Sequence, residues 1–169
     1  PKDLRALLYH ARQHDQEPQM LQSILRSNRQ QIDIAYQLIR QTRHKRVGVL
    51  GFSFKAGTDD LRESPMVELV ERLIGKGYKL RVYDRNVSLA NLQGANRAYI
   101  EKEIPHIASL MCDSIEDVLA DCDVVVVGNG APEFRQVVNL VQPDQIIIDL
   151  IRIGEETSRL NGQYNGICW

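Results

Sequence analysis

The sequence predicts an α/β fold in which a long helix precedes a doubly wound parallel sheet. Residues 19–43 contain neither glycine nor proline, which allows one uninterrupted helix across this stretch. Apolar runs without polar alternation follow at 124–127 and 146–148, and such runs are typical of parallel strands that are covered on both faces. Helical patterns separate the predicted strands, as a doubly wound sheet requires.

Length and composition limit the chain to one globular core. It has 169 residues, of which 43% are hydrophobic and 25% charged, enough for one core with a helical appendage and too few for two full domains. The pattern changes near residue 44, so we expect a helical region at 1–43 and an α/β domain at 44–169. The chain begins at Pro1 without a methionine or a signal-like segment, and we expect it to be a piece of a longer polypeptide.

Charge, hydropathy and cysteine content argue against several kinds of partner. The net charge of −1 comes from 21 basic and 22 acidic residues spread along the chain, so no basic face is expected to bind nucleic acid. No apolar run approaches the roughly 20 residues that a membrane helix needs. The odd number of cysteines (Cys112, Cys122 and Cys168) and the absence of C-x-x-C support neither a disulfide framework nor a zinc site. We therefore expect a cytoplasmic protein without a metal and with structural cysteines.

The helical region is expected to contain two helices. Asp3 is suited to cap the N-terminus of a short helix at 4–14. The sequence Asp-Gln-Glu-Pro at 15–18 then interrupts the pattern and starts a second, longer helix. This helix is expected to extend to about residue 43.

The long helix carries a broad apolar stripe. Apolar residues recur at alternating intervals of four and three, a heptad-like seam with one polar member, and a second apolar line lies beside it. A stripe of this width needs more cover than one small domain easily provides, so we favour a homodimer interface over burial within one chain, which stays an alternative. The polar member, Asn28, either fixes register or is a satisfied core amide. The seam consists of Leu21, Leu25, Asn28, Ile32, Ala35 and Ile39, and the second line of Ile24, Ile34 and Leu38.

The α/β domain is expected to alternate strands and helices. Ser64 is suited to cap a helix with Pro65 in its first turn, and Gly75 and Gly77 are expected to end that helix. Predicted strands occupy 46–50, 79–83, 123–127 and 145–149, predicted helices occupy 65–76, 115–120 and 132–141, shorter helices are expected around 88–92 and 99–103, and 163–169 is expected to form an edge strand.

The turn after the first strand, GFSFKAGTDDLRESP at 51–65, is the candidate site. Ligands of open parallel sheets bind beyond the carboxyl ends of the strands, which is where this turn falls. The turn lacks the G-x-G-x-x-G spacing that brings a backbone close to a pyrophosphate, so a complete NAD site within this domain is not expected. For the same reason we interpret Asp84, at the end of the second strand, as a strand-end carboxylate and not as a ribose ligand.

The cations of the turn have two interpretations. Lys55 can meet phosphate oxygens through charge-assisted hydrogen bonds, without a glycine-rich backbone. Alternatively, Lys55 and Arg62 only pair with the acidic residues beside them, and spacing alone slightly favours this second interpretation. Those acidic residues are Asp59, Asp60 and Glu63.

The turn also resembles a long motif of a known enzyme family. It matches F-K-x-x-T-D-D-x-R-x-S-P, the signature of the nucleotide-sugar 6-dehydrogenases (the UDP-glucose and GDP-mannose dehydrogenase family), at every specified position from Phe54 to Pro65. The first three residues of the chain match the end of that family's G-x-C-x-P-K-D motif, and Asn28 and Gln31 fit its N-x-x-Q. The order of elements agrees throughout, so the resemblance covers essentially the whole chain.

The resemblance implies an architecture and a chemistry. In this family an N-terminal Rossmann domain binds NAD, a long central helix forms much of the dimer contact, and a C-terminal Rossmann-like domain holds the nucleotide sugar. This chain would be the helix and the C-terminal domain. Such enzymes oxidise the C6 primary alcohol of a nucleotide hexose to a carboxylate with two NAD, through a thiohemiacetal and a thioester on a cysteine. That cysteine would lie just before Pro1, outside the chain.

The resemblance also implies four site residues. By residue-to-residue matching, Lys2 and Arg62 would contact NAD and Lys55 would contact the substrate. Asp3 would be catalytic, through the catalytic water and proton handling, and a role at the helix start is compatible with this.

Departures from the family pattern narrow the substrate. Where UDP-glucose dehydrogenases tend to have T-E-W and D-G-R-N, this chain has GNGAPEF at 128–134 and DLIR at 149–152. These stretches are more similar to the branch that oxidises GDP-mannose to GDP-mannuronate, the alginate precursor. They leave Arg152 without an assigned role.

Three alternatives to that substrate and activity stay open. One is a UDP-sugar 6-dehydrogenase, the second is a nucleotide-binding module without a catalytic half, and the third is an assembly domain whose function is its long helix. The sequence before Pro1 discriminates the enzyme from the last two, because a G-x-C-x immediately upstream and a G-x-G-x-x-G domain further up would establish it.

Overall fold

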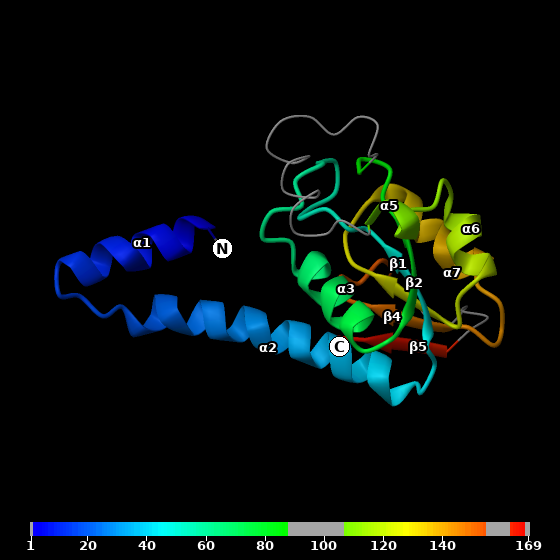
Figure 1. Ribbon diagram of the computed structural model, residues 1–169, viewed down its shortest axis with the longest axis horizontal. Helices are drawn as coiled ribbons and strands as arrows, with labels where there is room; N and C mark the ends of the chain where they lie inside the picture. Colours follow the sequence, from blue (N-terminus) through cyan, green and yellow to red (C-terminus); the bar gives the residue numbers. More distant parts are fainter. Residues whose placement is uncertain (1, 88–106, 155–162, 168–169) are drawn as a thin grey trace.

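The protein consists of a projecting pair of helices and an α/β domain (Figure 1). The computed structural model describes residues 2–87, 107–154 and 163–167. No helix within these ranges is long and apolar enough to cross a membrane. The helices are α1 (Lys2–Gln13), α2 (Gln19–Gln41), α3 (Pro65–Gly75), α5 (Ile107–Leu110), α6 (Ile115–Ala120), the 3₁₀ helix η1 (Pro132–Gln136) and α7 (Val137–Leu140), and the strands are β1 (Arg46–Leu50), β2 (Lys79–Tyr83), β3 (Val124–Val127), β4 (Ile146–Asp149) and β5 (Gln163–Gly166).

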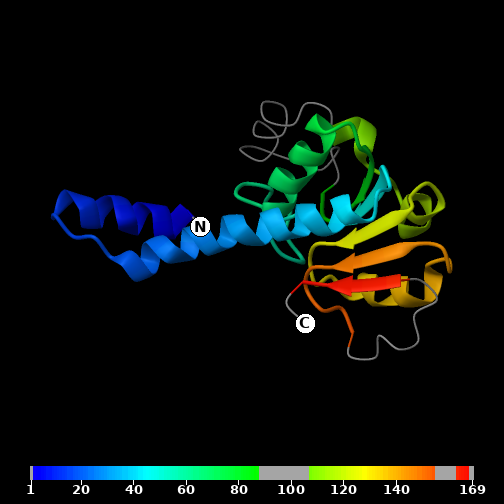
Figure 2. The same cartoon turned by 90° about the horizontal axis from the view of Figure 1, so that it is seen from below.

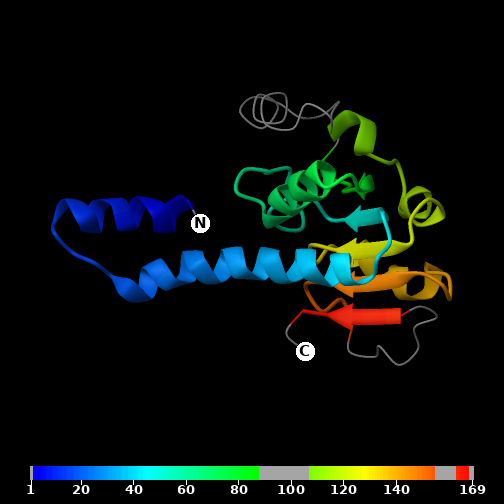
Figure 3. The same ribbon diagram turned by 60° about the horizontal axis from the view of Figure 1, so that its bottom comes forward.

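The described strands form one parallel sheet in the order β2-β1-β3-β4-β5. Strands β3, β4 and β5 lie side by side with their arrowheads at the same end in Figures 2 and 3. The chain moves outward from β1 first to β2 and then, in the opposite direction, to β3, so the sheet has a switch point between β1 and β3. This order confirms the predicted Rossmann-like, doubly wound parallel sheet.

Both faces of the sheet are covered by helices. Alternate residues of a strand point to opposite faces. Val124 and Val126 accordingly pack with α2 and α3 in one apolar cluster, while Val125 and Val127 pack with α6, η1 and α7 in another. Burial on both faces explains why β3 and β4 show no polar alternation, and each fully buried aliphatic side chain contributes about 1.5–3 kcal/mol.

The predicted elements are confirmed with a few differences in their bounds. Strands β3 and β4 begin one residue later than predicted. The predicted helix at 132–141 is the 3₁₀ helix η1 followed by the short helix α7. Asp3 does not cap α1, because the helix already begins at Lys2 and includes Asp3 in its first turn. The short helices expected around 88–92 and 99–103 lie outside the described residues.

Helix α3 begins where the sequence predicts and ends one residue earlier, at Gly75. Ser64 accepts a hydrogen bond from the Met66 N–H at 3.3 Å, and Pro65 occupies the first turn. At the other end Gly77 adopts a φ of 73°, and its N–H donates to the Ile74 carbonyl at 2.9 Å. The N-terminus of α3 therefore directly follows the candidate turn.

The apolar stripe of α2 divides into two parts. Its C-terminal half packs against α3 and the sheet, where Ile32 and Ile39 are buried. Its N-terminal half runs beside α1 and away from the α/β domain (Figure 1), and there Met20 is 80% and Ile24 40% exposed. The alternative of burial within one chain is therefore confirmed for the C-terminal half of α2. The homodimer interface stays a prediction for the N-terminal half. Asn28 is exposed, so it is not a buried core amide.

Candidate functional site

The turn 51–65 connects the carboxyl end of β1 to the N-terminus of α3. Hydrogen bonds within the turn close its middle part. The Phe54 N–H donates to the Asp60 carbonyl at 2.8 Å, and the Thr58 hydroxyl donates to the Lys55 carbonyl at 3.1 Å. The side chain of Thr58 and the backbone of Asp60 therefore shape the turn.

The two ends of the turn are tied to each other. The Ser64 hydroxyl donates to the Phe52 carbonyl at 2.9 Å, which joins the last residues of the turn to the first. Phe52 and Leu61 are fully buried and anchor the turn in the apolar core. Ser64 thus both caps α3 and closes the turn.

A buried carboxylate lies beneath the start of the turn. Asp84, directly after β2, is 5% exposed, and its Oδ2 accepts hydrogen bonds from the N–H groups of Phe52 (2.8 Å) and Ser53 (2.9 Å). The side-chain amide of Asn129, in the loop after β3, donates to the same oxygen at 3.2 Å. These contacts agree with the strand-end interpretation, because the oxygens that a ribose would need already accept protein donors.

Side chains pack closely against two glycines at the carboxyl ends of β1 and β3. Gly51 has a φ of 87°, and a Cβ at this position would lie 2.6 Å from Cγ of Asn129. A Cβ at Gly128 would lie 2.5 Å from Sδ of Met66. Asn129 and Met66 therefore pack closely against the backbone at the carboxyl ends of β1 and β3.

The two predicted cations of the turn have different environments. The Arg62 guanidinium pairs with Asp60 through Nε–Oδ1 at 2.8 Å and Nη2–Oδ2 at 2.9 Å, and this hydrogen bonding raises the Arg62 pKa. Lys55 is exposed, and in the part of the chain that the structure describes it forms no ion pair. Within that part, the pairing alternative is right for Arg62 and wrong for Lys55.

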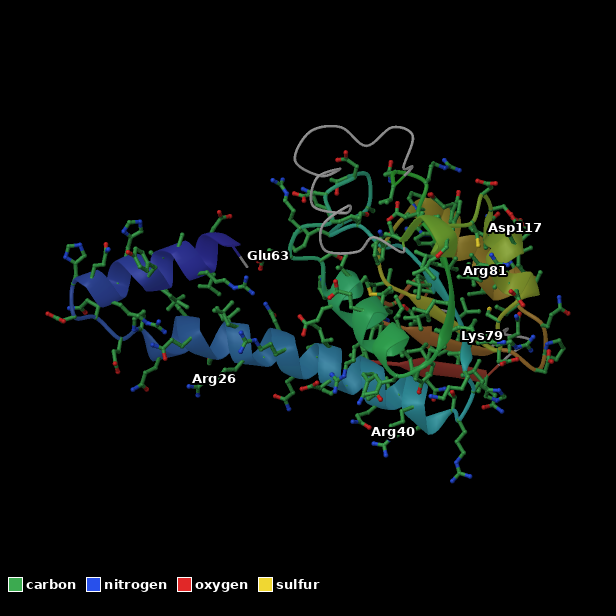
Figure 4. All side chains as sticks on the ribbon, viewed as in Figure 1. Arg26, Arg40, Glu63, Lys79, Arg81 and Asp117 are labelled. Carbon is green, nitrogen blue, oxygen red and sulfur yellow. The ribbon has the colours of Figure 1, made fainter. Side chains whose placement is uncertain are left out.

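The first turn of α1 meets the candidate turn. Arg5 forms an ion pair with Glu63, and Figure 4 shows Glu63 beside the N-terminal end of α1. Asp3 is exposed in the same first turn of α1. Lys2 begins the helix, and its side chain lies outside the described part. The predicted site residues thus come from two segments that the fold brings together.

A cleft of about 680 Å³ lies between α2 and α3, beside the turn. Asn28 and Gln31 of α2, the N-x-x-Q pair, line it together with Phe54 of the turn. Lys55 and Arg62 are not among the described residues that line this cleft. The N-x-x-Q pair of α2 therefore faces a cavity beside the turn.

Two cysteines are covered by the fold. Burial raises the pKa of Cys122 to about 12, and burial also raises the pKa of Cys112. Thiols with raised pKa values supply little thiolate, so structural roles fit both, while Cys168 lies outside the described residues. Among the residues described, no group of three or more potential metal ligands is placed to hold a metal ion.

Comparison with known families identifies the domain. Residues 48–156 match the UDP binding domain of the UDP-glucose/GDP-mannose dehydrogenase family. The chain belongs to this family. The match begins in β1 and includes the candidate turn, Asp84 and Asn129, while the site residues of α1 and α2 lie before it.

Relatives of the chain in the UDP-glucose/GDP-mannose dehydrogenase family differ in their similarity to it. GDP-mannose 6-dehydrogenase of Pseudomonas aeruginosa is 50% identical over 169 residues, which are 100% of this chain and 38% of the relative. UDP-glucose 6-dehydrogenase of Rickettsia felis is 31% identical over 141 residues, 80% of this chain and 30% of the relative. The crystal structure of a ternary complex of GDP-mannose dehydrogenase from Pseudomonas aeruginosa superposes with a TM-score of 0.88 and 50% identity over 100% of this chain and 38% of that chain. The chain thus spans 38% of the length of these two Pseudomonas aeruginosa proteins.

Two residues of the site were not predicted. Arg5 pairs with a residue 58 positions away, and no local spacing signals such a contact. Asn129 lies between two glycines directly after a buried strand, a signal of close backbone approach that could have indicated it.

Proposed function

We propose that the chain is the central helix and the nucleotide-sugar-binding domain of an NAD-dependent GDP-mannose 6-dehydrogenase. The whole enzyme oxidises GDP-mannose to GDP-mannuronate, the alginate precursor, with NAD bound by the N-terminal part of the same polypeptide. Identity of 50% over the full chain to a GDP-mannose 6-dehydrogenase, against 31% over 141 residues to a UDP-glucose 6-dehydrogenase, favours this substrate.

The presentation of Lys55 carries the proposal. Other polar residues of the motif have structural contacts, since Thr58, Asp60 and Ser64 all form hydrogen bonds within the turn. Of the two cations in the motif, Arg62 pairs with Asp60, whereas Lys55 forms no ion pair within the described ranges. Lys55 is exposed and lies beyond the carboxyl end of β1. An ammonium in this position is suited to hold the diphosphate of a nucleotide sugar.

The remaining predicted residues act from the two segments that meet at the Arg5–Glu63 ion pair. When bound, NAD supplies the oxidant for both steps. Arg62, whose guanidinium keeps its charge at any relevant pH, contacts one side of NAD while it shares Asp60, and Lys2 contacts NAD from the start of α1. Asp3 orients the hydrolytic water and receives a proton from it.

The proposal includes a homodimer. Apolar side chains on the projecting helices, Met20 and Ile24 among them, are uncovered in a single chain. A second copy of the protein that packs against this surface would cover them.

Kinetics of a Lys55→Ala variant of the full-length enzyme test the proposed role of Lys55. If Lys55 holds the substrate in a site that closes around it, removing one partner of a buried charge pair costs roughly 2–5 kcal/mol. At about 1.4 kcal/mol per tenfold, kcat/KM for GDP-mannose should fall about thirtyfold to several thousandfold. NADH formation measures the rate, and circular dichroism confirms the fold.

Lys79→Ala is the matched control. Lys79 is also exposed, but it begins β2 at the opposite end of the sheet (Figure 4), so kcat/KM should stay within about threefold of the wild type. A folded Lys55→Ala enzyme that also stays within about threefold would contradict the proposal, because a surface ion pair contributes only about 0–1 kcal/mol. Preference of the wild type for UDP-glucose over GDP-mannose would assign it to the UDP-sugar branch. Nucleotide-sugar binding without NAD reduction would assign it to the non-catalytic alternatives.

A further inference from the structure

We propose that Asp84 and Asn129 are positioning residues that hold the turn 51–65 so that Lys55 faces the nucleotide sugar. The inference rests on the proposed function of Lys55. Both side chains lie outside the F-K-x-x-T-D-D-x-R-x-S-P motif, and they come from the ends of two other strands, β2 and β3.

Asp84 satisfies its buried charge through hydrogen-bond donors of the protein. Its Oδ2 accepts from the N–H groups of Phe52 and Ser53 and lies 2.8 Å from the Ser53 hydroxyl, and its Oδ1 accepts from the Asn86 N–H at 3.0 Å. No basic side chain in the described ranges forms an ion pair with it. A buried carboxylate without a counter-charge depends on such donors, so Asp84 and the start of the turn stabilise each other.

Asn129 completes the network and orients the Ser53 hydroxyl. Its Nδ2 donates to Ser53 Oγ at 3.1 Å and to Asp84 Oδ2 at 3.2 Å, and its Oδ1 accepts from the Ala131 N–H at 3.2 Å. A serine hydroxyl has one proton and two lone pairs. Because Asn129 donates to Ser53 Oγ, the hydroxyl proton is left for Asp84 Oδ2 at 2.8 Å or for the Lys55 carbonyl at 3.1 Å. The network therefore reaches the backbone of Lys55 itself.

The start of the turn is held from three strands at once. The Gly51 N–H donates to the Tyr83 carbonyl of β2 at 2.9 Å, and the Asp84 carboxylate holds the next two N–H groups. On the β3 side, a Cβ at Gly51 would lie within 2.6 Å of Asn129, which shows how closely the two segments pack. A turn fixed from β1, β2 and β3 presents Lys55 at a set place beyond the sheet.

A second buried carboxylate offers a matched control. Asp149, at the end of β4, is fully buried and accepts from the N–H groups of Ile151 (2.9 Å), Arg152 (2.9 Å) and Ile153 (2.7 Å). Like Asp84 it is a buried carboxylate that accepts backbone N–H groups, and it also accepts from the Tyr164 hydroxyl at 2.6 Å, but it organises the turn after β4. Its replacement should damage that turn without acting through Lys55.

A double-mutant cycle in the full-length enzyme tests the inference. Asp84→Asn places an amide donor against backbone N–H groups and should lower kcat/KM for GDP-mannose by about tenfold or more. Because that loss arises through Lys55, the double variant Asp84→Asn with Lys55→Ala should lie within about threefold of Lys55→Ala alone. Asp149→Asn combined with Lys55→Ala should instead show the product of the two single losses. Independent, multiplying losses for Asp84 and Lys55 would overturn the inference.

Amide hydrogen exchange tests the same inference without substrate. In Asp84→Asn, exchange should become faster in the segment 52–58 and stay unchanged in the turn after Asp149, and Asp149→Asn should give the reverse pattern. If Asp84→Asn does not fold, Asn129→Ala replaces it in both experiments. It should also speed exchange in 52–58, and its loss of kcat/KM should not multiply with that of Lys55→Ala. Unchanged exchange in 52–58 would overturn the inference. If the wild type does not oxidise GDP-mannose, the proposed function is contradicted. The exchange experiment then still tests whether Asp84 holds the segment 52–58.

Discussion

Single residues in this fold owe much of their chemistry to burial. The thiol of Cys122 packs beneath β1, where its Sγ would lie 3.0 Å from a Cβ at Gly48. Burial is the largest cause of its raised pKa, and the neighbouring Asp121 and Asp123 contribute less. The same holds for Cys112, which is only partly covered.

The raised pKa of Cys122, about 12, predicts an unreactive thiol. Thiolate is the form that attacks disulfide reagents, and it is scarce in a thiol with such a pKa at pH 8. We expect a reagent such as dithionitrobenzoate to modify Cys122 only after unfolding, and Cys112 more slowly than a peptide cysteine. Mass spectrometry of labelled peptides separates the two sites, and rapid labelling of native Cys122 would contradict the prediction.

The ion pair between Arg46 and Asp123 predicts a pH-dependent contribution to stability. Arg46 lowers the pKa of Asp123 mainly through a side-chain hydrogen bond, and His44 also faces this carboxylate, with Nδ1 3.6 Å from Oδ2. A carboxyl group with a lowered folded-state pKa stabilises the fold above its unfolded pKa, and this contribution is lost as the pH falls through the folded-state pKa. Arg46→Gln should therefore lower Tm by no more than a few degrees at pH 7 and hardly at all near pH 2. Melting curves between these pH values measure it, and a Tm difference independent of pH would argue against the assignment.

The candidate site could be predicted from sequence only where contacts are local. Ser64 was predicted as the cap of α3 because the donor that it accepts lies two residues away. The partner of Arg62 could not be chosen from spacing, because several carboxylates are equally near in sequence. The structure pairs it with Asp60 and turns Glu63, at a φ of 61°, toward Arg5 of α1.

Among the elements, α2 shows how one sequence pattern serves two environments. Apolar residues with the same spacing are buried in the core along its C-terminal half, whereas along its N-terminal half Leu21 and Leu25 are half-buried and Ile24 is exposed. Periodicity reports that one face of a helix is apolar, but it does not report what covers that face. The sequence therefore predicted the helix and its apolar stripe correctly, but it could not show which surface covers each part of the stripe.

The C-terminal half of α2 should contribute strongly to stability. Ile39 is fully buried against the sheet, so Ile39→Ala should lower the free energy of unfolding by about 2–5 kcal/mol. Ile34→Ala in the same helix is the control, because Ile34 only packs at the edge of the core and should cost less. Urea denaturation of both variants measures the difference. Equal costs would show that α2 is not seated on the domain as described.

The strands were predicted more closely than the helix ends. Strand β1 occupies its predicted range because its residues after Arg46 form a buried apolar run, and β2 does so because exposed and buried residues alternate along it. The start of α1 was misplaced because Asp3 can stand either before a helix or in its first turn, and both positions suit a carboxylate near the positive end of the helix dipole. The 3₁₀ geometry of η1 depends on how the segment packs on the sheet and has no local signal of its own.

In the molecule as a whole, α1 and the first half of α2 form a projecting hairpin (Figures 1 and 3). Leu7 and Tyr9 on α1 are more than half exposed, as is Met20 on α2. Several large apolar side chains gathered on one projecting unit are typical of an interaction surface. Two partners can cover it, a second copy of the protein or the remainder of the same polypeptide, and a variant that separates the two can be designed.

The variant Met20→Glu with Ile24→Glu should convert a dimeric full-length enzyme into a folded monomer. Both side chains lie on the exposed half of α2, so charges there oppose an apolar interface without entering the core of the chain. Ile32→Glu is unsuitable, because Ile32 is buried within its own chain and its replacement should unfold the domain. Ser27→Glu with Gln30→Glu adds the same charge at exposed polar positions of α2 and should leave the dimer intact. Sedimentation velocity distinguishes the outcomes: a folded variant that remains a dimer would show that the hairpin is not the interface, and a variant that unfolds would show that the rest of the polypeptide covers it.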